Sequence, residues 1–199
     1  MLFLLFKIGH DRFALDASRV VEVIPLLGLK RVTGSPHGVA GIINYRGQHV
    51  PALDLCELTL NRPAAERMST RIVIIQCDEC RVTGDVKASD PSQVTRHTSP
   101  RLLGLIVEEA TGTLRKERAD FSESLAGMPS VVWQATSEKK AASPVTRHPS
   151  PILMDGQGVI HLLDETRFLG EHLRDELFPP SLSSGAAGKQ TVGLVDASD

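Results

Sequence analysis

The residues best suited to chemistry are cysteines and histidines. Cys77 and Cys80 form a Cys-x-x-Cys pair, a spacing found in half of a zinc site and in redox-active dithiols. A structural zinc site needs a second pair of ligands, and none of His97, His148 or Cys56 lies at a spacing that supplies it. We therefore expect Cys77 and Cys80 to be ordinary thiols at the end of a strand, with no metal and no cofactor.

Other catalytic patterns are missing from the sequence. It contains no Walker loop, no Rossmann glycine fingerprint and no Gly-x-Ser-x-Gly nucleophile elbow. Ser, His and Asp occur, but no spacing predicts that they meet in a triad. The sequence therefore favours a protein that is not an enzyme.

A single arginine stands at a position that a fold would fix. Arg46-Gly47 separates the apolar segment Val39–Ile43 from its return strand Val50–Leu53. Glycine suits the positive φ of a tight hairpin turn, so Arg46 is expected at the hairpin tip. Taken alone, it is either an exposed turn residue, a structural ion-pair partner or a contact for another molecule.

Composition limits the class of protein. The chain has 199 residues, 41% of them hydrophobic and 4% aromatic, with a net charge of -2. No basic patch with interleaved aromatic residues is present, which argues against nucleic acid as a partner. No apolar run reaches the about 18 residues of a membrane span, and the short apolar N-terminus lacks the basic region of a signal peptide. Three cysteines suit a reducing compartment, so a cytoplasmic protein is expected.

The elements that must position these residues are mostly strands. Short apolar runs separated by Gly, Pro, Asn or Asp are typical of β-structure. Strands are expected at Leu2–Ile8, Arg12–Asp16, Val20–Leu26, Val39–Tyr45, Gln48–Leu53, Arg71–Gln76, Leu102–Glu109, Ile152–Met154 and Val159–Leu163. Asp54 is expected to cap a short helix to about Leu60, and Asp164 a longer one before Pro179.

Three segments are too polar to bury a core: about 80–100, 136–150 and the tail 179–199. The first two share a repeat, Val94-Thr95-Arg96-His97 and Val145-Thr146-Arg147-His148, each followed by Ser-Pro and then an apolar strand. The repeat is consistent with two mobile insertions of similar origin or with a duplicated partner-binding or modified peptide. The sequence does not decide between them.

The ordered set of motifs resembles the CheW-like coupling proteins of bacterial chemosensory arrays. The resemblance covers about residues 1–178, apart from the two insertions. It rests on Phe3-x-x-Phe6, Phe13-Ala14-Leu15, Val21-Glu22-Val23-Ile24, Gly34-Ser35-Pro36, Gly41-Ile42-Ile43-Asn44-Tyr45-Arg46-Gly47, Val50 to Leu55, Leu103 to Ala110 and Val159 to Asp164. Departures are Tyr45 where the family usually has Leu, Thr33 where it often has Pro, and Glu108-Glu109 in place of Asp and a small residue.

The resemblance implies a mostly β fold, in which two five-stranded SH3-like barrels pack together and a C-terminal helix follows. It implies a non-catalytic scaffold that couples methyl-accepting chemoreceptors to the regulatory domain of a CheA-type histidine kinase, associated with membrane receptor arrays and monomeric outside them. By the same analogy, a receptor helical hairpin would lie in a groove between the lobes. The partner-binding residues carried over are Val21, Glu22, Val23, Ile42, Ile43, Arg46, Val107 and Ala110.

Three alternatives remain open from the sequence. One is a coupling protein of a non-flagellar pathway, serving surface sensing or a second messenger, which would accommodate the unusual loops. Another is a small metal-binding or catalytic β-barrel that uses Cys77 and Cys80. A third is an adaptor that binds only the kinase regulatory domain.

Overall fold

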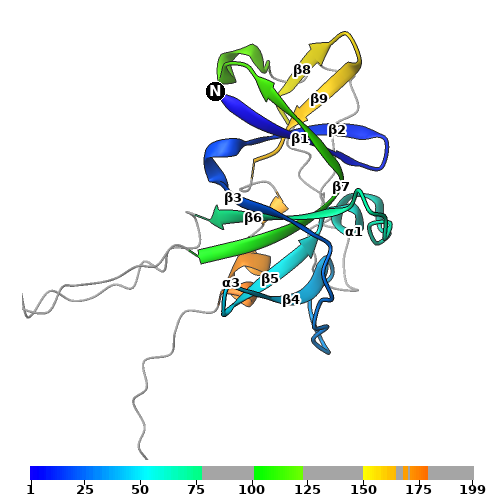
Figure 1. The fold of residues 1–199 in the computed structure, drawn as a ribbon, viewed down its shortest axis with the longest axis vertical. Coiled ribbons are helices and arrows are strands. Elements are labelled where there is room, and N and C mark those ends of the chain that lie inside the picture. The colour runs from blue at the N-terminus through cyan, green and yellow to red at the C-terminus, as the bar shows by residue number, and fades with distance from the viewer. Residues whose placement is uncertain (78–100, 123–149, 165–167, 170, 179–199) are drawn as a thin grey trace, which may run out of the picture.

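The chain forms two β-lobes, one above the other in Figure 1. The structure is a computed structural model, and it describes residues 1–77, 101–122, 150–164, 168–169 and 171–178. Strands make up most of the regular structure in this part of the chain, as the short apolar runs predict. The upper lobe in Figure 1 is called the first lobe here and the lower one the second lobe.

The first lobe combines strands from both ends of the described chain. Its members are β1 (Leu2–Ile8), β2 (Asp11–Asp16), β8 (Ile152–Asp155), β9 (Gly158–Leu162) and the second half of β7 (Arg101–Arg115). A two-residue loop at Gly9-His10 joins β1 to β2, and Gly9 has the positive φ of 63° that this turn needs. Strand β2 pairs in parallel with β9, so the lobe is assembled from segments far apart in the sequence.

The second lobe contains the strands around the Arg46 hairpin. They are β3 (Val20–Pro25), β4 (Val39–Tyr45), β5 (Gln48–Asp54), β6 (Arg71–Cys77) and the first half of β7. After β3, Lys30 forms both backbone hydrogen bonds with Ile42 (3.0 and 2.9 Å), which brings the β3–β4 connection onto the edge of β4. Gly41 permits this approach, because a Cβ there would lie 2.6 Å from the Lys30 carbonyl oxygen.

Strand β7 belongs to both lobes. Its first half, from Arg101 to Val107, pairs with β6, and its last residues, Gly112 to Arg115, pair with β1. Between the halves the register with β1 shifts, and Glu109 has a positive φ of 46°. The strand is therefore longer than the expected Leu102–Glu109, because after this irregularity it continues into the other lobe.

Two clusters of buried apolar side chains form the cores of the lobes. The interior of the first lobe contains Phe3, Ala14, Phe121, Ile160 and Leu162. The larger cluster fills the second lobe and extends over the facing side of the first, through Phe6, Ile8, Phe13 and Leu15. The expected mostly β fold, with two five-stranded lobes packed on a shared apolar interface, is thus confirmed.

Helices are short in the described residues. Helix α1 (Leu55–Leu60) begins as expected, since Asp54 accepts hydrogen bonds from the amides of Cys56 and Glu57 (2.9 and 3.2 Å). Helix α3 (Glu171–Leu177) lies in the segment expected to be helical after Asp164, although residues 165–167 and 170 lie outside the described part. Two 3₁₀ turns, η1 (Ala17–Arg19) and η2 (Arg118–Asp120), complete the elements. Each described helix is too short or too polar to cross a bilayer.

Several expectations concern segments that the structure leaves out or only borders. Residues 80–100, 136–149 and 179–199 lie outside the described part, so the insertions, the tail and the repeat remain predictions. Ser150, at the end of the second insertion, is buried. Cys77 is buried at the end of β6 and is disulfide-bonded, which contradicts the expectation of an ordinary thiol there. Cys80 is outside the described residues.

Candidate partner-binding surface

Strand β3 presents apolar side chains to solvent from the end of the sheet. It pairs with β6 and is the last strand of the second lobe on that side. Alternate residues point inward, and Val20 and Ile24 pack against the core. The outward residues Val21 and Val23 are 46% and 38% exposed. Two β-branched side chains are thus exposed on an edge strand, whose backbone groups on that side are not paired within the described sheet.

The hairpin between β4 and β5 has a rigid tip. Tyr45 pairs with Gln48, so the loop consists of Arg46 and Gly47 alone. Both have positive φ, 50° and 83°, as a type I′ turn requires. The Asn44 side chain accepts a hydrogen bond from the Gly47 amide at 3.0 Å, which stabilises the turn. The turn therefore fixes the position of the Arg46 Cβ atom.

A carboxylate on β3 joins the strand to this tip. One oxygen of Glu22, Oε2, accepts a hydrogen bond from the Tyr45 hydroxyl at 2.6 Å and one from Arg46 Nη2 at 2.7 Å. The Arg46 guanidinium lies 5.2 Å from the centre of the Tyr45 ring, within the range of a cation–π contact. Glu22 alternates with Val21 and Val23 along the strand, so its side chain leaves the opposite face of β3 from the two valines. We call the edge of the lobe formed by Val21, Glu22, Val23 and Arg46 the β3 surface.

The electrostatics of this cluster follow from its hydrogen bonds. The Tyr45 hydroxyl, followed by the charge of Arg46, lowers the pKa of Glu22, so this carboxylate is ionised at neutral pH. The same bond raises the pKa of Tyr45, which keeps its hydroxyl proton as the donor. Arg46 remains 73% exposed. The cluster is thus a charged pair at the surface, supported by a buried tyrosine.

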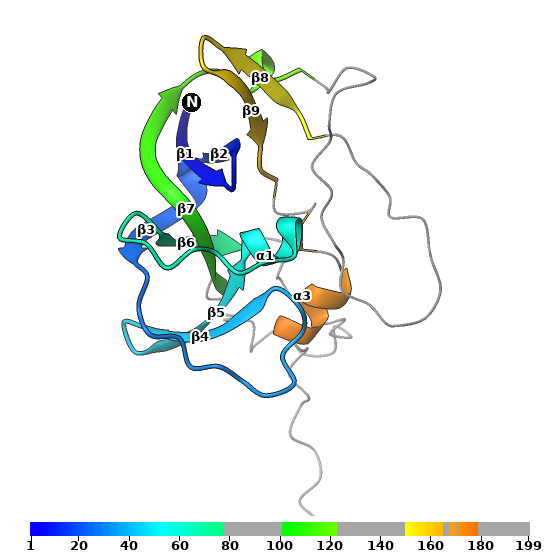
Figure 2. The ribbon, with the colours of Figure 1, turned by 90° about the vertical axis from the view of Figure 1, so that its right-hand side faces the viewer.

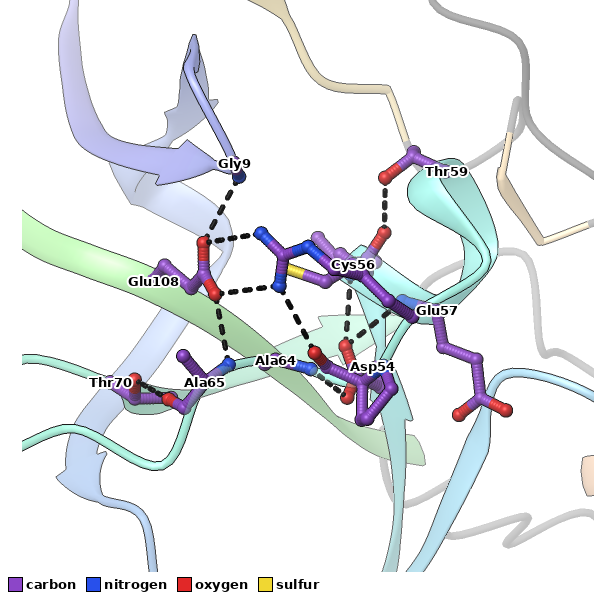
Figure 3. A network of polar contacts seen from close by, with 12 residues as sticks. Gly9, Asp54, Cys56, Glu57, Thr59, Ala64, Ala65, Thr70 and Glu108 are labelled. Atoms are coloured by element: carbon purple, nitrogen blue, oxygen red, sulfur yellow. Dashed lines mark hydrogen bonds and ion pairs between the residues drawn. The ribbon is translucent and has the colours of Figure 1, made fainter.

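A second polar network lies where the lobes meet (Figure 3). Glu108, on β7, accepts hydrogen bonds from the amides of Gly9 (3.1 Å) and Ala65 (2.9 Å) and from the guanidinium of Arg62 (3.1 and 3.3 Å). These bonds, led by those from Arg62, lower the pKa of Glu108 to about 2. Gly9 belongs to the first lobe and Arg62 to the second, so Glu108 connects the two.

Asp54 supports the same region from the second lobe. Besides capping α1, its other oxygen accepts a hydrogen bond from the Ala64 amide at 2.8 Å, which fixes the loop that carries Arg62. Burial raises the pKa of Asp54 although three amides donate to it. Burial also raises the pKa of the neighbouring Cys56 to about 12, so this thiol stays protonated and unreactive. Figure 2 places α1 and this loop at the level where the lobes meet.

The sequence model of the CheW-like domain family matches residues 2–146 of the chain, well over half of its length. The chain belongs to the CheW-like domain family. Among solved structures, it is similar to the scaffolding protein TtCheW from Thermoanaerobacter tengcongensis, with a TM-score of 0.55 and 17% identity. That match covers 82% of this chain and 83% of the other, and at this identity it shows a shared fold. No curated protein sequence matches significantly.

Within this CheW-like fold, the residues carried over from the family lie in three settings. On the β3 surface, Glu22 pairs with Arg46, and Val21 and Val23 are exposed on the other face of the same strand. Ile42 is half-buried on β4, and Ala110 is half-buried on β7 against the large cluster. Ile43 and Val107 are 3% and 0% exposed, so in this conformation they support the surface from the core.

Two residues important to these sites were not singled out from the sequence. Tyr45 was visible only as a departure from the usual Leu, and Arg62 carried no signal. Each acts through a partner distant in the sequence, Glu22 for Tyr45 and Glu108 for Arg62. A tyrosine next to an arginine at a hairpin tip is the one clue that could have pointed to Tyr45.

The second lobe also contains a groove of about 620 Å³ beside the β3–β4 connection. The groove is lined by apolar residues such as Leu26, Leu29 and Val39, with Glu57 and Glu66 among its charged residues. It lies within the second lobe, whereas the expected receptor groove between the lobes remains a prediction. In the described part of the chain, no three His, Cys, Asp or Glu side chains are grouped so that they could hold a metal ion.

Proposed function

We propose that this CheW-like protein is a non-catalytic scaffold that couples chemoreceptors to a CheA-type histidine kinase. The observation that carries the proposal is the β3 surface, where exposed Val21 and Val23 flank Glu22 along the edge strand and Glu22 pairs with Arg46. The family match supports the general role of a signalling scaffold. The particular partners, and a place in the cytoplasm beneath receptor arrays, are part of the proposal.

A receptor tip suits this surface on physical grounds. A helical hairpin presents rows of aliphatic side chains one turn apart, with polar residues on either side. Val21 and Val23 offer an apolar strip along the edge strand, and Arg46 adds a charged group at the neighbouring hairpin tip. Apolar contact would supply most of the affinity, and the charged group would set orientation.

Binding measurements on purified components test the proposal. A receptor cytoplasmic fragment and a CheA-type regulatory domain are each mixed with the wild-type protein, alone and together. Arg46→Ala and Val21→Asp are compared with Arg115→Ala and Met154→Asp, which change exposed residues of the first lobe. We expect the first two substitutions to weaken receptor binding at least tenfold and the two controls to leave it unchanged.

The outcomes separate the candidates. If neither partner binds the wild-type protein, the coupling role is wrong, although the fold stands. If the kinase domain alone binds, and Arg46→Ala leaves its affinity unchanged, the adaptor interpretation replaces the coupling role. Binding to receptors of only one class would distinguish a flagellar from a non-flagellar pathway.

A further inference from the structure

Tyr45 makes a polar contact next to the β3 surface that a leucine at the same position could not make. The ring is 7% exposed and belongs to the large apolar cluster, as a leucine at the same position would. Its hydroxyl, however, reaches Glu22 Oε2 at 2.6 Å. A buried phenol that ends on a surface carboxylate adds a hydrogen bond that an aliphatic side chain cannot make.

The tyrosine holds the arginine in two ways. Its hydroxyl and Arg46 Nη2 share one oxygen of Glu22, so the phenol fixes the acceptor that the guanidinium uses. Its ring also lies 5.2 Å from the guanidinium carbon. Without the hydroxyl, Glu22 would be held in place only by an arginine that is itself 73% exposed.

The arrangement leaves a defined part of Arg46 available. Within the described residues, Nη2 donates to Glu22, and Nε and Nη1 donate to no other group. A guanidinium presents its donors in a planar fork that matches a carboxylate in a bidentate pair. The available donors of Arg46 therefore suit an acidic side chain of a partner that binds at the hairpin tip beside β3.

We infer that Tyr45 is a positioning residue, which orients Arg46 so that the β3 surface recognises a carboxylate on its partner. The inference rests on the proposed function for the identity of that partner, a receptor helix. Because the arginine is already ordered, binding loses less side-chain freedom than it would with a mobile arginine. Tyr45 acts through Arg46 and needs no contact with the partner itself.

A double-mutant cycle tests this inference in the binding assay. We expect Tyr45→Phe to weaken receptor-fragment binding about three- to tenfold, the range of one side chain's ordering. In an Arg46→Ala background, the same substitution should have no effect. Arg46→Lys keeps the positive charge but lacks the planar set of guanidinium donors, so its affinity for the receptor fragment should stay below that of the wild-type protein. An equal loss in both backgrounds would show that Tyr45 acts by another route, and would overturn the inference.

A second measurement needs no partner, so it distinguishes failure of the inference from failure of the coupling role. In NMR titrations, Tyr45→Phe should raise the pKa of Glu22, because the phenol is the main group that lowers it. The order parameter of the Arg46 Nε–H bond should fall in the same variant, and also in Glu22→Gln. If Arg46 is equally ordered in both variants, the inference is wrong, whatever the receptor does. Unchanged melting temperatures confirm that the fold is intact.

Discussion

Replacement of Glu108 by glutamine should destabilise the whole protein, because this carboxylate connects the two lobes. Its side chain is 12% exposed and receives hydrogen bonds from Gly9 on one side and from Arg62 and Ala65 on the other. Glutamine has the same shape but no charge. The side-chain NH₂ of glutamine would also face N–H groups of Gly9, Ala65 or Arg62, which now donate to a carboxylate oxygen.

The size of the effect follows from the pKa of Glu108. A fall from 4.5 to about 2 means that the folded state favours the ionised carboxylate by about 3 kcal/mol. Arg62 is 44% exposed, so solvent screening reduces its share. We therefore expect Glu108→Gln to lower the free energy of unfolding by about 2 kcal/mol at pH 7. For a chain of this length, that is a fall in melting temperature of about 4–8 °C.

The pH dependence gives the decisive assay. Because the folded pKa lies below the unfolded one, the stabilisation is complete above pH 4.5 and is lost as the pH falls towards about 2. Urea unfolding at pH 7 and pH 3 should thus show a wild-type advantage that shrinks at the lower pH. Glu109→Gln is the matched control, since Glu109 is 36% exposed and, in the described part of the chain, forms its ion pair with Lys7, whose side chain is 42% exposed. If Glu108→Gln lowers the free energy of unfolding by the same amount at both pH values, or by no more than Glu109→Gln does, this role of Glu108 is refuted.

Three further predictions concern single sites. Burial lowers the pKa of His161, so the wild-type protein should lose stability as the pH falls below about 6.5. His161→Phe should make the free energy of unfolding less dependent on pH, as measured by urea titrations between about pH 7 and 5. Gly41→Ala should cost about 2–3 kcal/mol, since the added Cβ would meet the Lys30 carbonyl at 2.6 Å, whereas Gly156→Ala, with open space around it, should cost less than about 0.5 kcal/mol. Asp54→Ala removes the α1 cap and a loop hydrogen bond, and should lower the free energy of unfolding by about 2–3 kcal/mol.

Local chemistry made much of the second lobe predictable. The strands Val39–Tyr45 and Gln48–Asp54 and the tight turn between them follow from apolar runs on either side of a glycine. The Asp54 cap follows from its place before an apolar helix. These features depend on residues close together in the sequence, where spacing and backbone preference are sufficient guides.

The contacts that define the two polar clusters were not predictable in this way. Glu22 and Tyr45 are 23 residues apart, and Arg62 and Glu108 are 46 apart. Whether such side chains meet depends on strand register and on how the lobes pack, which no local pattern encodes. The length of β7 was underestimated for a related reason, since its last residues are stabilised by β1 in the other lobe.

The order of the strands means that the first lobe is not a contiguous piece of the chain, because all the strands of the second lobe are inserted between β2 and the second half of β7. Strands β3 to β6 stand between β2 and β7 in the sequence, and the first lobe is closed by β8 and β9, which come later still. A cut that isolates either lobe would divide β7, which pairs with β6 in one lobe and with β1 in the other. Separating the roles of the lobes requires surface substitutions in the intact protein. Its folding should be slow and cooperative, because the earliest strands pair with some of the last.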